Sequence, residues 1–174
     1  MCVIDKQARL QGRLLPEIEA FREHCQSLQL ATLNDGFPHA SYAPFAYTEA
    51  GYFILISDIA QHGQNLKTEK SVSFMMLDDE SAAKSIFARR RLSYESLAHC
   101  VDKKSELGMQ ALSALEARFG EMIPQLSQLN DFNLYQLKPL KGRYVKGFGK
   151  AFELTGDELQ EITHLQGGHN KGHG

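Results

Sequence analysis

The stretch QLATLNDGFPHAS, residues 29–41, has the pattern of two β-strands joined by a tight turn. Strand-forming residues lie on both sides of Asn34-Asp35-Gly36, and an Asp-Gly pair between such segments is typical of a hairpin turn. Pro38 fixes the backbone at the entry to the second strand. We therefore predict a β-hairpin with strands over residues 28–34 and 39–47.

Strand patterns continue along the rest of the chain. GYFILIS, residues 51–57, is an apolar run with aromatic and β-branched residues, which suits a strand buried on both faces. Further strands are predicted over residues 71–77, 91–101, 132–137 and 142–152, the last two joined at residues 138–141. Six or seven antiparallel strands with few helices predict a mainly β protein, a small antiparallel barrel with flanking helices.

Helical spacing appears in three places. A helix is predicted to begin at Pro16, a short one to cover residues 64–67, and a third to run from Ser105 to about Gly120. After residue 154 the sequence changes and ends in GGHNKGHG, which has nothing to bury. We expect one barrel domain with an N-terminal helix over residues 1–154, followed by a flexible Gly/His-rich tail over residues 155–174.

Composition excludes several classes of function. The chain has 174 residues, 43% hydrophobic and 23% charged, as expected of a folded domain, and a net charge of -2 that argues against a nucleic-acid-binding surface. Neither a signal peptide nor a membrane-spanning run is apparent, so we expect a cytoplasmic protein. Cys2, Cys25 and Cys100 form no spaced pair, which predicts neither a disulfide framework nor a zinc site.

Several of these segments together carry a family resemblance. The opening hairpin followed by Pro44-Phe45, then GYFILIS at 51–57, HGQNL at 62–66 and SVS at 71–73, resembles the pyridoxamine-phosphate-oxidase-like, FMN-binding split barrels. The resemblance covers roughly residues 28–150. It implies a homodimeric split β-barrel, a fold that hosts flavin enzymes, haem enzymes and flavin-free binders alike.

Two further segments narrow the resemblance. RRLS at 90–93 and GRYVKGFGKAF at 142–152, with a histidine-bearing tail, resemble HutZ/HugZ-type haem oxygenases. This implies that haem binds near the dimer interface, that His169 holds the iron, and that Asp131 of the opposite subunit hydrogen-bonds that histidine. The implied activity is opening of the porphyrin ring with dioxygen and with electrons from a reductase or a small molecule, which releases iron.

Each implied residue suits its role chemically. A neutral imidazole such as that of His169 provides a lone pair for iron, and a carboxylate such as that of Asp131 fixes its tautomer and raises its basicity. Arg91 carries a permanent charge and can contact the oxygen-binding side or the haem propionates. If ligand and carboxylate come from different subunits, only the dimer completes the site.

Alternatives remain open at each position. His173 and His164 compete with His169 as the iron ligand, and Asp131 can be an ordinary turn residue. His62 either lines a ligand pocket or caps the short helix. Two other functions stay in view. One is an FMN-dependent oxidoreductase that grips the flavin phosphate with Arg91, Lys67 and residues 57–65. The other is a haem storage or delivery protein without turnover.

Overall fold

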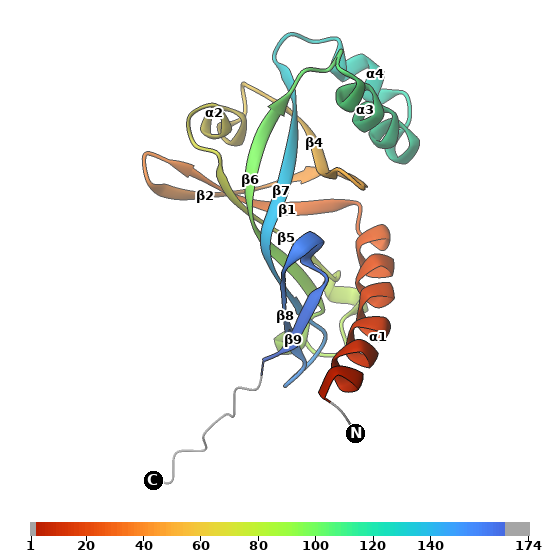
Figure 1. Ribbon diagram of the computed structural model, residues 1–174. Helices are drawn as coiled ribbons and strands as arrows, with labels where there is room; N and C mark the ends of the chain where they lie inside the picture. The colour runs from red at the N-terminus through yellow and green to blue at the C-terminus, as the bar shows by residue number, and fades with distance from the viewer. Residues whose placement is uncertain (1–2, 166–174) are drawn as a thin grey trace.

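The computed structural model describes residues 3–165, which form one antiparallel sheet with α-helices packed against it (Figure 1). The strands are β1 (Ser27–Asn34), β2 (Phe37–Pro44), β3 (Ala46–Thr48), β4 (Gly51–Ser57), β5 (Ser71–Leu77), β6 (Arg91–Val101), β7 (Phe132–Val145), β8 (Ala151–Thr155) and β9 (Glu161–His164). The helices are α1 (Val3–His24), α2 (Gln61–Thr68), α3 (Glu106–Phe119) and α4 (Met122–Ser127), with single 3-10 turns at Glu80–Ala82, Ile86–Ala88 and Asp157–Leu159. The predicted mainly β, antiparallel class is confirmed, with nine strands in the sheet rather than six or seven.

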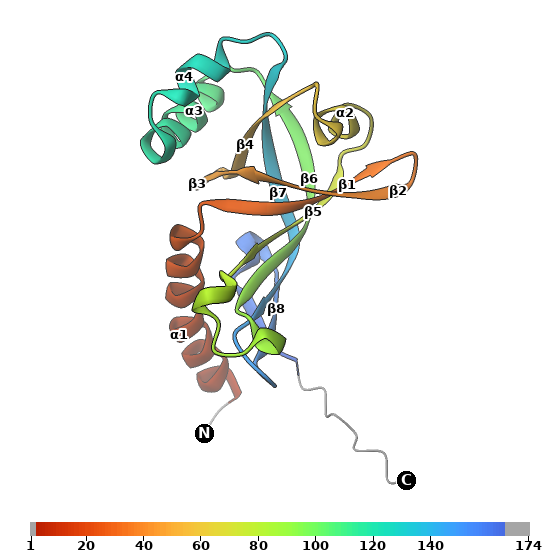
Figure 2. The ribbon, with the colours of Figure 1, turned by 180° about the vertical axis from the view of Figure 1, so that it is seen from behind.

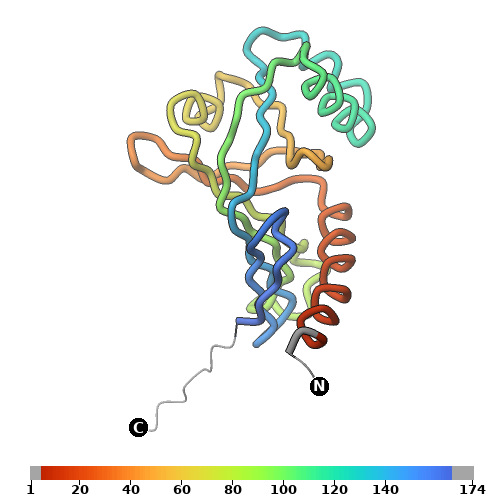
Figure 3. The backbone as a smooth tube through the Cα atoms, in the orientation of Figure 1, coloured from red at the N-terminus to blue at the C-terminus, as the bar shows by residue number. Residues whose placement is uncertain are grey.

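The long strands β6 and β7 hold the two halves of the sheet together. The strand order is β2-β1-β5-β6-β7-β4-β3, and β8 and β9 extend the sheet from the other half of β7. The first half of β7 therefore pairs with β4, and its last residues pair with β8. Figures 2 and 3 show β3 and β4 toward one end of the β6–β7 pair and β8 toward the other end.

The two ends of the β6–β7 pair lie next to different elements. The α2 end is where Val101 pairs with Leu134, next to the strand β4 that leads into α2. The tail end is where Arg91 pairs with Val145, next to β8 and β9.

The predicted hairpin is confirmed. β1 and β2 pair from Ser27 opposite Pro44 to Asn34 opposite Phe37. The two turn residues Asp35 and Gly36 have φ values of 49° and 79°, the left-handed region that a two-residue hairpin turn of this twist requires. The expected single strand over residues 39–47 is instead two, because the chain turns after Pro44 and β3 pairs with β4.

The strand β4 is buried on both faces, as its apolar run predicts. Tyr52, Ile54 and Ile56 belong to the main core, which also contains residues of α1, β1, β5, β6 and β8. Phe53 and Leu55 point to the other side and pack with α3, α4 and Leu134 in a second core. A strand between two cores has no solvated face, which explains the missing apolar-polar alternation.

The prediction that the first helix begins at Pro16 is wrong, because α1 starts at Val3 and contains Pro16. Pro16 lies on the exposed face of the helix. The buried positions Leu14 and Ile18 lie on either side of it, at 0% and 4% exposure. The apolar stripe thus continues through the proline, and packing of α1 on the core stabilises a helix that its proline alone disfavours.

The two strands predicted over residues 132–137 and 142–152 are a single strand, β7, followed by β8. Glu95 pairs with Lys141 while Ser96 pairs with Pro139, so that Leu140 is the extra residue of a β-bulge. A bulge accepts a proline within a strand because the ladder is interrupted there. Lys138 to Lys141 therefore bend the strand instead of ending it.

We expected the barrel domain to end at residue 154, whereas the sheet continues through β9 to His164. Ile162 of β9 is fully buried in the main core, and the Gln7 side chain of α1 donates a hydrogen bond to its carbonyl oxygen. Of the helices in residues 3–165, none is both long enough and apolar enough to cross a bilayer.

Candidate functional site

Asp131 lies at the α2 end, directly before β7, and its carboxylate is held by the neighbouring strand β4. The hydroxyl of Ser57, the last residue of β4, donates a hydrogen bond of 2.7 Å to Asp131 Oδ2. The backbone N–H of Asp58 donates to the Asp131 carbonyl oxygen, also at 2.7 Å. Asp131 is therefore more than a residue that closes its own turn, because its side chain contacts a strand far away in sequence.

A second carboxylate, that of Asp58, lies beside it and has a cation. Lys67 Nζ lies 2.5 Å from Asp58 Oδ2, and Asn133 Nδ2 donates to Asp58 Oδ1 at 2.7 Å. The hydrogen bond from Lys67 lowers the pKa of Asp58, so this carboxylate is ionised at neutral pH. Lys67 thus already pairs with a carboxylate, so it should bind a flavin phosphate less strongly than the sequence suggested.

His62 faces the hairpin from the first turn of α2. Its Nδ1 lies 2.9 Å from the hydroxyl of Ser41 on β2. Partial burial lowers the pKa of His62, and the nearby His39 lowers it further. The imidazole is therefore neutral at physiological pH, and within residues 3–165 it is held by one hydrogen bond, through Nδ1.

The rest of the HGQNL segment is structural. Asn65 is 3% exposed and donates a hydrogen bond of 2.9 Å to Thr32 Oγ1 on β1, while Leu66 enters the main core. A Cβ on Gly63 would lie 2.1 Å from the carbonyl oxygen of Ser57, so only glycine permits this approach. The segment locks α2 against β1 and the end of β4, where Ser57 contacts Asp131.

In the basic run at residues 89–91, two arginines are held by contacts within the fold and the third keeps most of its donors free within residues 3–165. Asp78 accepts two hydrogen bonds of 3.1 Å from Arg90, one from Nε and one from Nη2, and the Arg90 guanidinium also lies over the Phe21 ring at 4.4 Å. Arg89 donates to the Asp78 carbonyl oxygen. Arg91 has only a 3.2 Å hydrogen bond to the Arg89 carbonyl among the described residues, which leaves most of its donors for another partner.

Leu165, the last described residue, lies at the tail end of the sheet, three strands across from Arg91. Arg91 pairs with Val145, Val145 pairs with Ala151, and the N–H of Leu165 donates to the Ala151 carbonyl oxygen at 2.8 Å. His169 and His173, two of the three candidate iron ligands, lie outside the described residues. The third, His164, contacts the Gly149 carbonyl through Nε2 at 2.8 Å and packs on Phe152 with ring centroids 5.0 Å apart, so it packs within the tail end of the sheet.

The structure therefore brings some predicted residues together and separates others. Asp131 and α2 with His62 lie at one end of the β6–β7 pair, and Arg91 and the start of the tail lie at the other. Ser57 and Asp58 were expected only in a flavin phosphate grip, and their contacts with Asp131 were not anticipated, since pairing of β4 with β7 is what brings them there. Within residues 3–165, no group of three His, Cys, Asp or Glu side chains is placed to hold a metal ion.

Comparison with known proteins identifies the family. A family model described as pyridoxamine 5'-phosphate oxidase matches residues 14–146. The chain is 50% identical over 167 residues to heme oxygenase HutZ of Vibrio cholerae serotype O1, with 95% of each chain covered. The chain belongs to the HutZ proteins of the pyridoxamine 5'-phosphate oxidase family.

Solved structures of HutZ-like proteins confirm the split barrel. HutZ from Vibrio cholerae, described as a heme storage protein, matches at 49% identity with a TM-score of 0.70, covering 73% of this chain and 90% of that one. ChuZ from Campylobacter jejuni matches at 35% identity with a TM-score of 0.82, covering 91% of this chain and 65% of that one. A heme binding protein from Mycobacterium smegmatis shares the fold at 22% identity and a TM-score of 0.73.

Proposed function

We propose that this protein is a haem oxygenase that binds haem between two copies of the chain and opens the porphyrin ring with dioxygen and supplied electrons. The observation that carries the proposal is 50% identity to heme oxygenase HutZ over 95% of the chain. Asp131 and Arg91 fit it, because each has the acceptor or donor that haem binding needs and keeps part of that capacity free of the contacts described above.

Chain reach supports a site made by two subunits. His169 follows Leu165 by four residues, which span at most about 14 Å when fully extended. Asp131 lies at the far end of β7, roughly 40 Å away along the strand at about 3.3 Å per residue. This separation favours contact of His169 with Asp131 of a second copy, and we propose a homodimer in which the tail end of one subunit meets the α2 end of its partner.

Each proposed site residue has its own role in binding haem. His169 donates its imidazole lone pair to the iron, and Asp131 accepts the other ring N–H and fixes the tautomer. The Ser57 hydroxyl orients that carboxylate through its 2.7 Å hydrogen bond. Haem would supply the iron that reacts with dioxygen when bound, and the Arg91 guanidinium would bind its propionates or order water near it.

The flavin alternative is less well supported. It relies on Lys67 and Arg91 as one phosphate grip, but Lys67 is paired with Asp58 at the α2 end, whereas Arg91 lies at the tail end. Storage without turnover is favoured by one description of the Vibrio HutZ structure as a heme storage protein. The test must therefore measure both binding and degradation.

The test is a titration with hemin followed by absorption spectroscopy, then addition of ascorbate in air. We expect a saturable Soret band that bleaches in the wild-type protein, an altered band without bleaching in His169→Ala, and wild-type behaviour in the matched control His164→Ala. A stable Soret band that never bleaches in the wild type would replace turnover by storage. No specific binding would overturn the haem proposal, and wild-type spectra from His169→Ala with loss in His173→Ala would reassign the ligand.

A further inference from the structure

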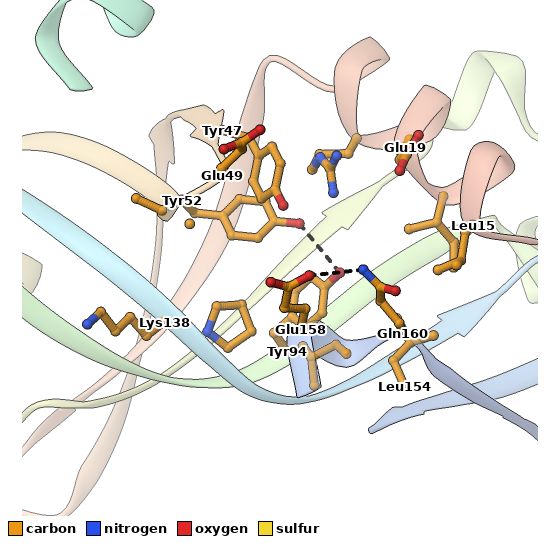
Figure 4. Close-up of a pocket in the computed structure, with 16 residues that line it drawn as sticks. Leu15, Glu19, Tyr47, Glu49, Tyr52, Tyr94, Lys138, Leu154, Glu158 and Gln160 are labelled. Atoms are coloured by element: carbon orange, nitrogen blue, oxygen red, sulfur yellow. Dashed lines mark hydrogen bonds between the residues drawn. The ribbon is translucent and has the colours of Figure 1, made fainter. Parts of the chain in front are cut away.

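A cavity of about 740 Å³ lies between α1, the turn that joins β3 to β4, and the 3-10 turn before β9. Two of its lining residues, Tyr52 and Tyr94, are 2% and 6% exposed. Figure 4 shows Tyr47 and Tyr52 on one side of this space, with Tyr94, Glu158 and Gln160 on the opposite side. The volume is in the range of small-molecule sites. Neither Arg91 nor Asp131 lines this cavity.

The inner part of the cavity has hydrogen-bond donors that lack acceptors. Arg22 of α1 lines the cavity, and its Nε is buried without a hydrogen-bond partner. Its guanidinium carbon lies 3.5 Å from the centroid of the Tyr47 ring, which holds the cation but accepts no in-plane hydrogen bond. A buried donor without an acceptor costs free energy, so a ligand that supplies an acceptor is favoured.

The two buried tyrosines add a second donor. The Tyr52 hydroxyl donates to Tyr94 at 3.4 Å, and the Tyr94 hydroxyl itself has no acceptor among residues 3–165. Burial raises the pKa of Tyr94 to about 12, so that this hydroxyl keeps its proton at neutral pH. An acceptor that enters the cavity therefore meets one cationic donor and one neutral donor.

The outer part of the cavity limits the charge of that ligand. Glu19, Glu49 and Glu158 line the cavity and are exposed, with Lys138 the exposed cation among the lining residues. Three carboxylates at the opening repel an anion of high charge, whereas the single guanidinium inside matches one negative charge. Leu15, Ile18 and Leu154 supply apolar wall between the two zones.

We propose that this cavity is a second binding site, separate from the haem site, for an aromatic monocarboxylate. The carboxylate accepts hydrogen bonds from Arg22 and Tyr94, and the aromatic ring lies against the apolar wall near Ile18 and Leu154. A ligand held this way contacts α1, β6 and β8 together, so its binding stabilises the folded protein by mass action.

The test is isothermal titration calorimetry of the full chain with naphthoate, its neutral counterpart naphthamide, and naphthalenedicarboxylate. We expect saturable binding of naphthoate, with weaker binding of both other compounds. Arg22→Gln should weaken naphthoate binding by about 10- to 100-fold, the range for loss of a hydrogen bond from a charged group. Tyr94→Phe should weaken it by about 3- to 10-fold, the range for a neutral hydrogen bond.

Controls make the result specific to the cavity. Arg13→Gln removes an exposed arginine of the same helix that does not line the cavity, and should leave binding unchanged. Naphthoate should raise the thermal unfolding temperature of the wild type and of Arg13→Gln. If Arg22→Gln fails to fold, Tyr94→Phe removes one oxygen and keeps the test valid. Three results would overturn the proposal: no binding at millimolar naphthoate, binding of naphthamide as tight as that of naphthoate, or binding of naphthoate by both cavity variants as tight as by the wild type. None of these results affects the hemin titration.

Discussion

Arg91 and Asp131 lie at opposite ends of the paired strands β6 and β7, so that one chain cannot place both side chains beside the same small ligand. Arg91 pairs with Val145 next to the start of the tail, and Asp131 contacts Ser57 where β4 ends. If both residues act on one haem, they must come from two subunits. Mixing variants of the two residues can therefore test whether each site takes residues from two subunits.

Arg91→Ala and Asp131→Ala should each lose haem degradation, and a mixture of the two should regain it. A mixed dimer has one site with both substitutions and one site with neither, because each site takes Arg91 from one subunit and Asp131 from the other. Random exchange makes about half of the dimers mixed, so about a quarter of all sites are intact. The measurement is the rate of Soret bleaching after co-refolding of equal amounts of the two variants.

The control for this experiment mixes Asp131→Ala with Ser57→Ala, two substitutions at the same end of the chain. In that mixed dimer each site has one altered subunit at the α2 end, so no site is fully restored. Recovery in the Arg91 mixture alone supports the shared site. Activity that stays at the level of the separate variants in both mixtures would show that each chain builds its site by itself.

Sequence reasoning predicted the parts of the fold whose pattern is local. The hairpin turn at Asp35-Gly36 and the limits of β5 and β6 follow from turn chemistry and alternation, and the structure places them as expected. The continuity of β7 through Pro139 was missed because a bulge depends on the partner strand, where Glu95 and Ser96 shift the register. β9 was missed because four residues with one buried side chain give too little pattern.

In the candidate site, too, the sequence could indicate single residues but not the contacts that depend on pairing of distant strands. Asp131 and Arg91 came from the family resemblance, and the structure adds what surrounds them. The Ser57 hydroxyl on Asp131 could not be predicted, because it depends on the pairing of Ser57 with Phe132 across two distant strands. The ion pair of Lys67 with Asp58 likewise could not be predicted, because it depends on a tertiary contact.

Gly63→Ala should destabilise the protein and disturb the α2 end. The added Cβ would lie 2.1 Å from the Ser57 carbonyl oxygen, so α2 must move away from β4. We expect a loss of about 1–3 kcal/mol in the free energy of unfolding, as for other overpacked sites, together with slower haem degradation. Urea unfolding and the bleaching rate measure the two effects.

The matched control is Gly12→Ala on α1, where a Cβ meets no atom within 4 Å. Alanine is the better helix former, so this variant should gain about 0.5–1 kcal/mol. If Gly63→Ala were as stable and as active as the wild type, the close packing of α2 against Ser57 would not be needed for the site.

His62 should make the haem-free protein less stable in mild acid. Burial, with His39 nearby, lowers the pKa of His62 in the folded state, so the unfolded chain takes up the proton first as the pH falls. The stabilisation is therefore present above the unfolded value of about 6.5 and is lost as the pH falls from there toward the folded value. Between pH 7.5 and pH 5.5, His62→Gln should therefore lose less stability than the wild type, as measured by urea unfolding at both pH values. His24→Gln is the control, and an equal loss in all three proteins would contradict the assignment.

Glu17 should anchor α1 to the tail end of the sheet. Its carboxylate accepts hydrogen bonds from the Tyr144 hydroxyl at 2.8 Å and from Lys146 Nζ at 2.6 Å. Partial burial on its own raises the pKa of Glu17, but the hydrogen bonds from Lys146 and Tyr144 outweigh it and lower that pKa overall. At pH 7, Glu17→Gln should lose about 1–2 kcal/mol of unfolding free energy, the range for hydrogen bonds to a charged group.

The pH dependence separates the charge of Glu17 from the shape of its side chain. A lowered folded pKa contributes stability above the unfolded value of about 4.3, and this contribution disappears as the pH falls through the folded value. The difference between wild type and Glu17→Gln should therefore shrink by pH 3, as measured by urea unfolding at both pH values. The exposed neighbour Glu19 is the control, since Glu19→Gln should cost little at either pH. A difference for Glu17→Gln that stays the same at pH 3 would assign the loss to packing of the side chain, because the protonated carboxyl of the wild type and the amide of the variant then carry no charge.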